Sequence, residues 1–231
     1  MVAVVAGRTD RAPRCNSGGR GHHRGGLDLW RGPRASAGGG GRMTGRIDIS
    51  LGLPPSLRHE AAAIYWQAFG GKLGRIMGPD ARALAFLARV MRADHALVAR
   101  DEAGALLGLA GFKTPQGSFA GGSWADMQAI YGLAGVVWRL PLLALLSREV
   151  DNDRFLLDGI CVAPAARGLG VGSALMAAIE DEARARGYGY VRLDVIDTNW
   201  RARALYERLG YMGVKTVPLG PLRHVFGFDA A

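Results

Sequence analysis

The residue types between Arg167 and Gly172 favour the binding of a phosphate group. Glycines alternate there with larger residues, in the order Arg167, Gly168, Leu169, Gly170, Val171 and Gly172, with Ser173 following. A glycine has no side chain to hold a ligand away, so successive backbone N–H groups can gather round an anion beside the Arg167 guanidinium. The alternative is that the glycines only allow a sharp bend in the chain.

The segments on either side of these glycines support the phosphate-binding interpretation. Residues 155–162 (FLLDGICV) form a short apolar run that predicts a buried strand, and apolar residues recur every four positions from 170 to 186, which predicts a helix. The first turn of that helix contains no Asp or Glu, although acidic residues commonly answer the positive end of the helix dipole there. The sequence therefore leaves this helix end for an anionic ligand.

Two known phosphate-binding arrangements can be compared with this spacing. A P-loop requires a lysine directly after its last glycine, but Gly172 is followed by Ser173, so the P-loop is excluded. A dinucleotide-binding fold also runs strand, glycine turn, helix and strand, and Asp194 or Asp197 would supply its acid. Its glycines follow the strand directly, however, whereas residues 163–167 intervene here. This spacing weakens the dinucleotide-binding alternative without removing it.

A second motif follows the next strand-like run, which covers residues 190–195. The residues from 199 to 211 read NWRARALYERLGY. They resemble the N-x-x-A-x-x-L-Y-x-x-x-G-[FY] pattern of the GCN5-related N-acetyltransferase (GNAT) family. The earlier stretch is similar to the acetyl-CoA motif of that family, [QR]-x-x-G-x-[GA] after V-x-P, through Val162, Pro164, Arg167, Gly170 and Gly172. Both matches, in this order and at this separation, make the resemblance specific.

The resemblance implies a fold and a reaction. The fold is α/β, with a mixed sheet and helices on both faces, as in the acyl-CoA N-acyltransferases, over residues 43–231. The acyl donor is acetyl-CoA, no metal takes part, and a neutral amine attacks the thioester directly in a ternary complex. The two strands part at their carboxyl ends and leave a slot for the pantetheine arm, which pairs with the backbone of Ile160, Cys161 and Val162. The turn from Arg167 to Ser173 then holds the pyrophosphate.

The resemblance also assigns roles to two side chains of the second motif. Tyr206 matches the tyrosine that protonates the departing CoA thiolate, and Asn199 matches a residue that contacts the cofactor arm. Both have plainer alternatives. Tyr206 shares a helix face with apolar residues and packs there, while Asn199 caps the N-terminus of the same helix.

Two carboxylates are candidates for the base that deprotonates the amine. Asp158 and Asp194 each interrupt an apolar strand, where a carboxylate is costly unless it is paired or employed. A salt bridge with Arg192 or Arg154 is the alternative, and water can relay the proton instead. An acyl-CoA-binding sensor without turnover is the remaining functional alternative.

Charge and composition separate the first 42 residues from the rest. The 231 residues are 49% hydrophobic and carry a net charge of +9. Residues 1–42 contain eight arginines and two aspartates, a net +6 (8 − 2), which leaves +3 for residues 43–231. Eleven glycines and few large apolar residues in the first segment predict a disordered extension, with no specific nucleic-acid partner.

Cysteine, histidine and apolar content limit the compartment and the partners. Cys15, Cys161 and five scattered histidines support neither a disulfide framework nor a metal site, and they fit a reducing cytoplasm. The longest apolar run, 136–146, contains Arg139 and Pro141 and is too short to span a bilayer. The expected partners are acetyl-CoA and an amine acceptor, and the expected state is a monomer or homodimer without a membrane span.

The remaining segments predict the rest of the mixed sheet. A strand, a helix and a second helix precede a hairpin, and two strands close the domain; they cover 47–51, 57–69, a helix starting at Asp80, 95–100 with 105–113, 214–219 and 223–228. Residues 116–154 predict a helical insertion near the acceptor end of the site. A dimer surface or a patch that touches a membrane is the alternative for this insertion.

Overall fold

The structure, a computed structural model, describes residues 2–8, 46–146, 155–196 and 199–217. Its helices and strands follow the chain in the order β1 (Val2–Arg8), β2 (Asp48–Leu51), α1 (Arg58–Met77), α2 (Asp80–Val90), β3 (Ala96–Arg100), β4 (Leu106–Thr114), β5 (Gly117–Ser118), α3 (Trp124–Leu146), β6 (Phe155–Val162), α4 (Val171–Ala185), β7 (Tyr190–Ile196), α5 (Trp200–Arg208) and β8 (Met212–Val217). Short 3-10 turns join some of them, at Pro55–Leu57, Ala93–His95 and Pro164–Ala166.

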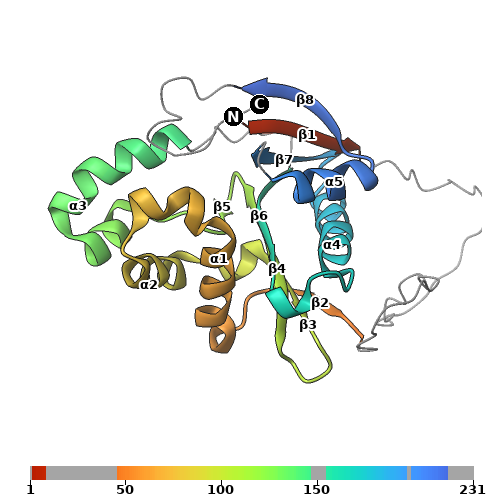
Figure 1. Ribbon diagram of the computed structural model, residues 1–231, viewed down its shortest axis with the longest axis horizontal. Helices are drawn as coiled ribbons and strands as arrows, with labels where there is room; N and C mark the ends of the chain where they lie inside the picture. Colours follow the sequence, from red (N-terminus) through yellow and green to blue (C-terminus); the bar gives the residue numbers. More distant parts are fainter. Residues whose placement is uncertain (1, 9–45, 147–154, 197–198, 218–231) are drawn as a thin grey trace, which may run out of the picture. The chain divides into compact units, whose positions relative to one another are not determined.

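An eight-stranded mixed sheet runs through the structure (Figure 1). Its strands lie in the order β2-β3-β4-β6-β7-β1-β8, and β5 pairs with β4. β6 and β7 are parallel, whereas the other described pairs are antiparallel. The predicted mixed α/β fold and its hairpin, now β3 and β4, are confirmed. So many antiparallel neighbours distinguish this sheet from the parallel sheet of a dinucleotide-binding fold.

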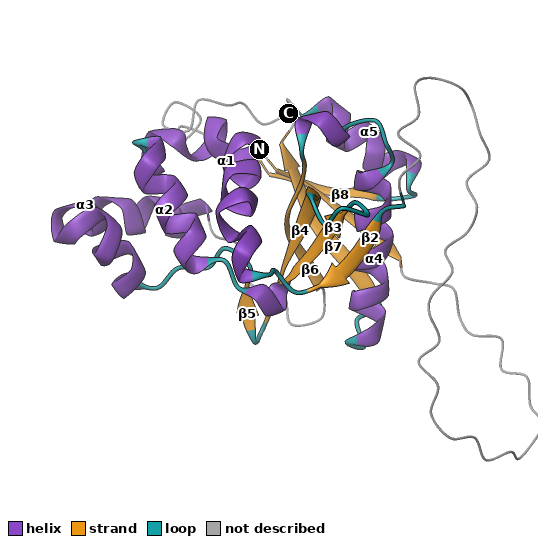
Figure 2. Ribbon diagram, turned by 90° about the horizontal axis from the view of Figure 1, so that it is seen from below, coloured by secondary structure: helices purple, strands orange, loops and turns teal. Residues whose placement is uncertain are grey.

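Helices cover both faces of the sheet, and each face has its own core (Figure 2). The helices α1, α2 and α3 lie on one side, while α4 and α5 lie on the other. The core on the α4 side contains the residues whose spacing predicted that helix, each at most 1% exposed: Val171, Leu175, Ile179 and Ala183. Burial of this stripe against the sheet fixes α4, and with it the glycine turn at the N-terminus of the helix.

Helix α1 runs further than the sequence indicated. Gly70 and Gly71 predicted a stop, but the helix continues to Met77. The reason is tertiary, because Ile76 and Met77 are buried and thereby favour the added turns. Local glycine content was the weaker influence here.

Helix α3 closes the C-terminal end of α1. Arg139 donates from Nε to the backbone oxygen of Ile76 at 2.7 Å and from Nη2 to that of Gly78 at 3.1 Å. The Tyr131 hydroxyl donates to the backbone oxygen of Met77, and the Arg139 guanidinium lies 4.2 Å from the centroid of the Tyr131 ring. These donors, which we call the α3 clamp, satisfy carbonyl groups that the end of a helix leaves without intrahelical partners.

The α3 clamp belongs to the segment 116–154, which was expected to be a helical insertion. The segment contains β5 and α3, and residues 147–154 lie outside the described residues. Gly132, with a φ of 70°, interrupts the helical backbone of α3. None of the described helices is long and apolar enough to cross a membrane.

Strand β1 differs from the expectation for residues 1–42. Their glycine and arginine content predicted a disordered extension, yet Val2–Arg8 forms a strand between β7 and β8 and is antiparallel to both. The apolar run VAVVA suits a strand with neighbours on each side, and the average composition of the 42 residues obscured it. Residues 9–45 and the predicted closing strand 223–228 lie outside the described residues.

Replacing Arg139 with Met should destabilise the protein, because the change removes the guanidinium donors and leaves an apolar side chain of similar length. A buried acceptor left unsatisfied costs about 1–3 kcal/mol, so we expect the free energy of unfolding to fall by that amount in urea denaturation. Arg89→Met is the control, because Arg89 is 51% exposed and forms an ion pair with Asp126 at 2.7 Å. Such exposed pairs contribute about 0.2–1 kcal/mol. Equal losses in the two variants would contradict the α3 clamp.

Candidate active site

The glycine turn between β6 and α4 presents bare backbone to its surroundings. Gly168 and Gly170 have φ angles of 81° and 85°, in the left-handed region that favours glycine, and a Cβ added to either would meet no atom within 4 Å. Gly170 is the N-cap of α4, where no described side chain caps the helix and the first turn has no acidic residue. The first N–H groups of α4 therefore lie beside the exposed Arg167 without side-chain partners, in an arrangement suited to an anion.

Buried neighbours hold both ends of this turn in place. Before the turn, the Ala163 amide donates to the backbone oxygen of Leu107 in β4 at 2.9 Å, and Ala166 is buried. After the turn, Val171 is buried against the sheet. The intervening residues 167–170 are exposed, so the turn has a fixed base and an accessible tip.

The parallel strands β6 and β7 part after a short pairing. The paired residues are Phe155 with Val191, Leu156 with Arg192 and Leu157 with Leu193. Beyond Leu157, β6 stays paired with β4 as far as Val162, but no described strand pairs with its other edge. Ile160, Cys161 and Val162, the residues expected to meet the pantetheine arm, lie on this stretch. Such an edge can pair with an extended ligand as it would with a strand.

A β-bulge lies at the point where the strands part. Gly111 of β4 is opposite Gly159, and the next residue, Phe112, is opposite Leu157, so Asp158 is the extra residue. The bulge places Asp158 and Gly159 next to each other on the face of the sheet that α1 covers.

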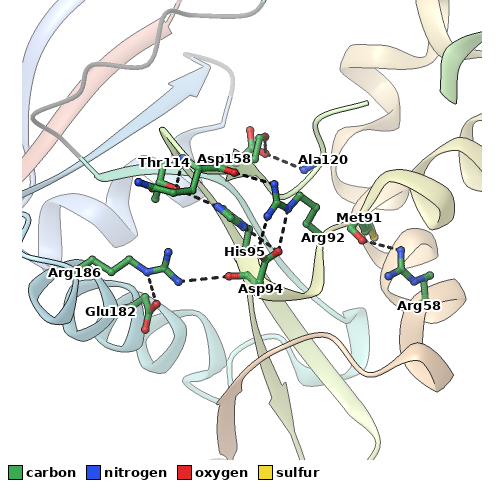
Figure 3. A network of polar contacts seen from close by, with 12 residues as sticks. Arg58, Met91, Arg92, Asp94, His95, Thr114, Ala120, Asp158, Glu182 and Arg186 are labelled. Carbon is green, nitrogen blue, oxygen red and sulfur yellow. Dashed lines mark hydrogen bonds and ion pairs between the residues drawn. The ribbon is translucent and has the colours of Figure 1, made fainter. Parts of the chain in front are cut away.

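Donors from the β4–β5 hairpin and the residues after it hold the Asp158 carboxylate. Oδ2 of Asp158 accepts hydrogen bonds from the Ser118 hydroxyl at 3.0 Å and from the Ala120 amide at 3.3 Å (Figure 3). The first candidate base is thus a carboxylate held in a defined position at the parting of the strands.

A polar network that the sequence did not reveal fixes the same hairpin (Figure 3). Arg92 donates from Nη1 to the backbone oxygen of Gln116 at 2.9 Å. The Arg92 guanidinium beside Asp94 holds the pKa of that carboxyl well below its usual range. The buried His95 ring lies between them and the hairpin, with Nδ1 3.0 Å from Asp94 Oδ1 and Nε2 3.1 Å from Thr114 Oγ1. These contacts position the hairpin that carries Ser118.

Aromatic side chains of α1 cover the other residue of the bulge. A Cβ added to Gly159 would lie 2.9 Å from Cζ of Phe69 and 3.1 Å from Cε2 of Tyr65, so the rings lie closer to the strand than a side chain at this position would readily allow. Burial raises the pKa of the Tyr65 hydroxyl well above its usual value, and the charge of Asp158 adds to the rise. The sequence placed Tyr65 only within the predicted helix 57–69. The glycine inside an apolar strand was the available signal of a close approach.

The second candidate base, Asp194, directly follows Leu193, the last residue of β7 that pairs with β6. Leu193 packs in the core on the α4 side, so Asp194 lies on the opposite face of the sheet, as Asp158 does. Arg192 Nε is 3.8 Å from Asp194 Oδ1, so the salt bridge considered as an alternative is present. Arg154 lies outside the described residues. The structure therefore brings both candidate carboxylates to the parting of the two strands.

Helix α5 packs against the glycine turn. A Cβ added to Gly172 would lie 3.4 Å from Cδ2 of Leu205. Asn199 is the N-cap of α5, and its Oδ1 accepts a hydrogen bond from the Ala202 amide at 3.2 Å. The capping alternative for Asn199 is thus observed.

Tyr206 lies on the inner face of α5. The side chain is 5% exposed, and its ring centroid is 6.1 Å from that of Tyr211. Burial raises the pKa of Tyr206 to about 12. The Tyr206 hydroxyl has no hydrogen-bond partner within the described ranges, whereas that of Tyr211 donates to Glu180 at 3.0 Å. The packing alternative and a role as proton donor are therefore compatible for Tyr206.

Cys161 is a free, buried thiol on the parted stretch of β6. Burial raises its pKa to about 12, so the sulfur stays protonated near neutral pH and is a poor nucleophile. Among the residues that the structure describes, no group of three or more His, Cys, Asp or Glu side chains is placed to hold a metal ion.

Known proteins share parts of this sequence and of this fold. Over 68 residues the chain is 40% identical to a streptothricin acetyltransferase from Streptomyces lavendulae, a match that covers 29% of this chain and 36% of the length of that relative. The solved structure of a histone acetyltransferase HPA2 and related acetyltransferase from Corynebacterium glutamicum has a TM-score of 0.56 and 22% identity, and covers 81% of this chain and 93% of its own. An N-acetyltransferase from Staphylococcus aureus has a TM-score of 0.54 and 16% identity, with coverage of 79% and 97%. At these identities the two solved structures show a common fold.

The sequence profile of one family extends over both motifs and over the elements that carry them. Residues 59–211, more than half of the chain, match the profile described as the Acetyltransferase (GNAT) family. The match begins in α1 and includes the bulge, the glycine turn and α5. The chain therefore belongs to the acetyltransferase (GNAT) family.

Proposed function

We propose that the protein is an acetyl-CoA-dependent N-acetyltransferase, which transfers the acetyl group to a primary amine by direct attack in a ternary complex. The observation that carries the proposal is the uncapped N-terminus of α4, presented by Gly168 and Gly170 after the stretch of β6 that β7 leaves unpaired. A helix end of this kind suits a pyrophosphate, and an unpaired strand edge suits an extended amide-bearing arm. Acetyl-CoA contains both groups.

The donor-binding residues follow from these two features. Residues 167–173 would hold the pyrophosphate, and the backbone of residues 160–162 would pair with the pantetheine arm. Oδ1 of Asn199 accepts the hydrogen bond that caps α5. Asn199 would therefore contact the pantetheine arm through the N–H groups of its side-chain amide.

The transfer needs one proton removed and one supplied. The amine nitrogen forms a bond to the thioester carbon, the carbon–sulfur bond breaks, and the amine loses a proton to Asp158, Asp194 or water. The CoA thiolate takes a proton from Tyr206, whose pKa of about 12 keeps the phenol protonated near neutral pH. The protonated state of Cys161 supports direct transfer over an acetyl-cysteine intermediate.

A sensor that binds acyl-CoA without turnover is the second candidate. The observation that favours it is that both carboxylates already have partners, Asp158 in the hairpin region and Asp194 in Arg192. A panel of amines assayed for free CoA release decides between the two, because a sensor would bind acetyl-CoA and release none.

We place this activity in the cytoplasm, in a monomer or homodimer that binds no specific nucleic acid. The free Cys161 thiol supports a reducing compartment.

Gly170→Glu should abolish CoA binding, because it adds bulk and a negative charge where the pyrophosphate would lie. Gly104→Glu is the matched control, since Gly104 in the β3–β4 turn has a φ of 84°, close to the 85° of Gly170, and equally open surroundings. Both variants thus carry similar backbone strain. In calorimetric titration with CoA, Gly104→Glu should bind like the parent protein, whereas Gly170→Glu should not bind. Normal CoA affinity in Gly170→Glu, or a parent protein that binds NAD and not CoA, would refute this assignment.

Tyr206→Phe should lower kcat by about 10²–10⁴-fold with little change in the KM for acetyl-CoA, because it removes the proton donor and keeps the buried ring. Tyr211→Phe is the control. It breaks the bond to Glu180 and should lower the melting temperature while leaving kcat close to that of the parent. If kcat falls by less than about threefold in Tyr206→Phe, Tyr206 is not the proton donor and only packs in the core.

Asp158→Asn and Asp194→Asn should identify the base through the pH profile of kcat/KM. A carboxylate base is active only when ionised, so the rate falls as the pH drops and the carboxylate takes up a proton. The variant that lacks the base should lose this acidic limb, whereas the other variant and the surface control Asp181→Asn should keep it. If both site variants keep the limb, water is the immediate proton acceptor.

A further inference from the structure

The Tyr65 hydroxyl is a polar group in a buried side chain that has no hydrogen-bond partner among the described residues. Tyr65 is 6% exposed, and Cε2 of its ring would lie 3.1 Å from a Cβ added to Gly159 in the bulge. Burial raises the pKa of the Tyr65 hydroxyl, and the charge of Asp158 adds to the rise. The hydroxyl therefore faces the bulge. A hydroxyl that has no protein partner and lies at a candidate active site is available to form a hydrogen bond with a ligand.

Asp158 presents an unused acceptor at the same place. The Ser118 hydroxyl and the Ala120 amide both donate to Oδ2, and within the described ranges no donor reaches Oδ1. The carboxylate is thus held in position by one oxygen and keeps the other for a donor that the chain does not supply. Such a donor need not be a neutral group, because a carboxylate forms its strongest hydrogen bonds with cations.

The surroundings of these two groups favour a cation. The rings of Tyr65 and Phe69 lie with centroids 4.5 Å apart over Gly159, and aromatic faces attract ammonium groups. Asp194 adds a second carboxylate where β6 and β7 part.

We propose that Tyr65 and Asp158 form a subsite for a protonated amino group of the acceptor, and that the preferred acceptors are small aliphatic molecules with at least two amino groups. This inference rests on the proposed transferase function. The ammonium donates to Asp158 Oδ1 and to the Tyr65 oxygen, beside the aromatic rings that cover Gly159. The second amino group of the same molecule, in its neutral form, lies beside the parting of the strands and attacks the thioester. Since Asp158 then holds a cation, the base is Asp194 or water.

The test compares diamines with monoamines of the same chain length, from 1,3-diaminopropane to 1,5-diaminopentane against 1-aminopropane to 1-aminopentane. Free CoA release gives kcat/KM for each amine. The best diamine should exceed its matched monoamine by roughly tenfold or more, as expected for a hydrogen-bonded charge. Tyr65→Phe should lower this ratio at least about threefold, because one hydrogen bond to the ammonium is lost. Asp158→Asn should bring the ratio close to one.

Tyr190→Phe is the control for the loss of a tyrosine hydroxyl, because Tyr190 is 46% exposed at the start of β7. Its ratio should equal that of the parent. Turnover without preference for diamines in the parent, or an equal loss of preference in Tyr65→Phe and Tyr190→Phe, would overturn the subsite.

Calorimetric titration of the best-matched diamine into the CoA complex tests the subsite without turnover. Binding that weakens in Tyr65→Phe and not in Tyr190→Phe supports the subsite even if no amine releases CoA, and in that case it is the transferase function that fails. If CoA release occurs but the diamine binds no better than its monoamine, the subsite fails while the transferase function stands.

Discussion

Backbone N–H and C=O groups inside a protein need hydrogen-bond partners, and after Leu157 one edge of β6 no longer pairs with β7. The rest of the candidate site is arranged around this constraint. On one side of the sheet the buried stripe of α4 fixes the glycine turn at the end of the open stretch, and on the other α1 covers the bulge at its beginning. A ligand that reaches from the bulge to the turn would satisfy the edge and the uncapped helix end together.

Features that depend on local spacing were predictable from the sequence. The four-residue recurrence in α4, the glycine turn and the β3–β4 hairpin are all confirmed, since each is set by residues close together in the chain. The extent of α1 was not predictable, because its last turns depend on Tyr131 and Arg139, which are distant in the sequence. β1 was missed for another reason: a short apolar run lay inside a segment whose average composition resembles disorder.

In the candidate site, too, residues marked by local sequence patterns were predictable and residues placed by tertiary contacts were not. Motif spacing indicated Asn199 and Tyr206, and a carboxylate inside an apolar strand indicated Asp158 and Asp194. The structure adds the contacts that hold these side chains. The sequence motifs could not indicate Tyr65 or the free Oδ1 of Asp158. Both depend on a one-residue shift in register between β4 and β6, and on two donors, from the β4–β5 hairpin and from Ala120 after it, that reach the same oxygen. A register shift leaves no signature in composition. Only the glycine within an apolar strand hinted that another element approaches closely there.

The α3 clamp has an evolutionary consequence. It holds the carboxyl end of α1, the helix that places Tyr65 and Phe69 over the bulge, while the glycine turn depends on α4 across the sheet. If α1 lines the amine subsite as proposed, substitutions in α3 would shift α1 and change which amines are accepted, while the residues proposed to bind acetyl-CoA would keep their positions. Relatives that differ in this insertion would be free to diversify in substrate while their cofactor chemistry stays under separate selection.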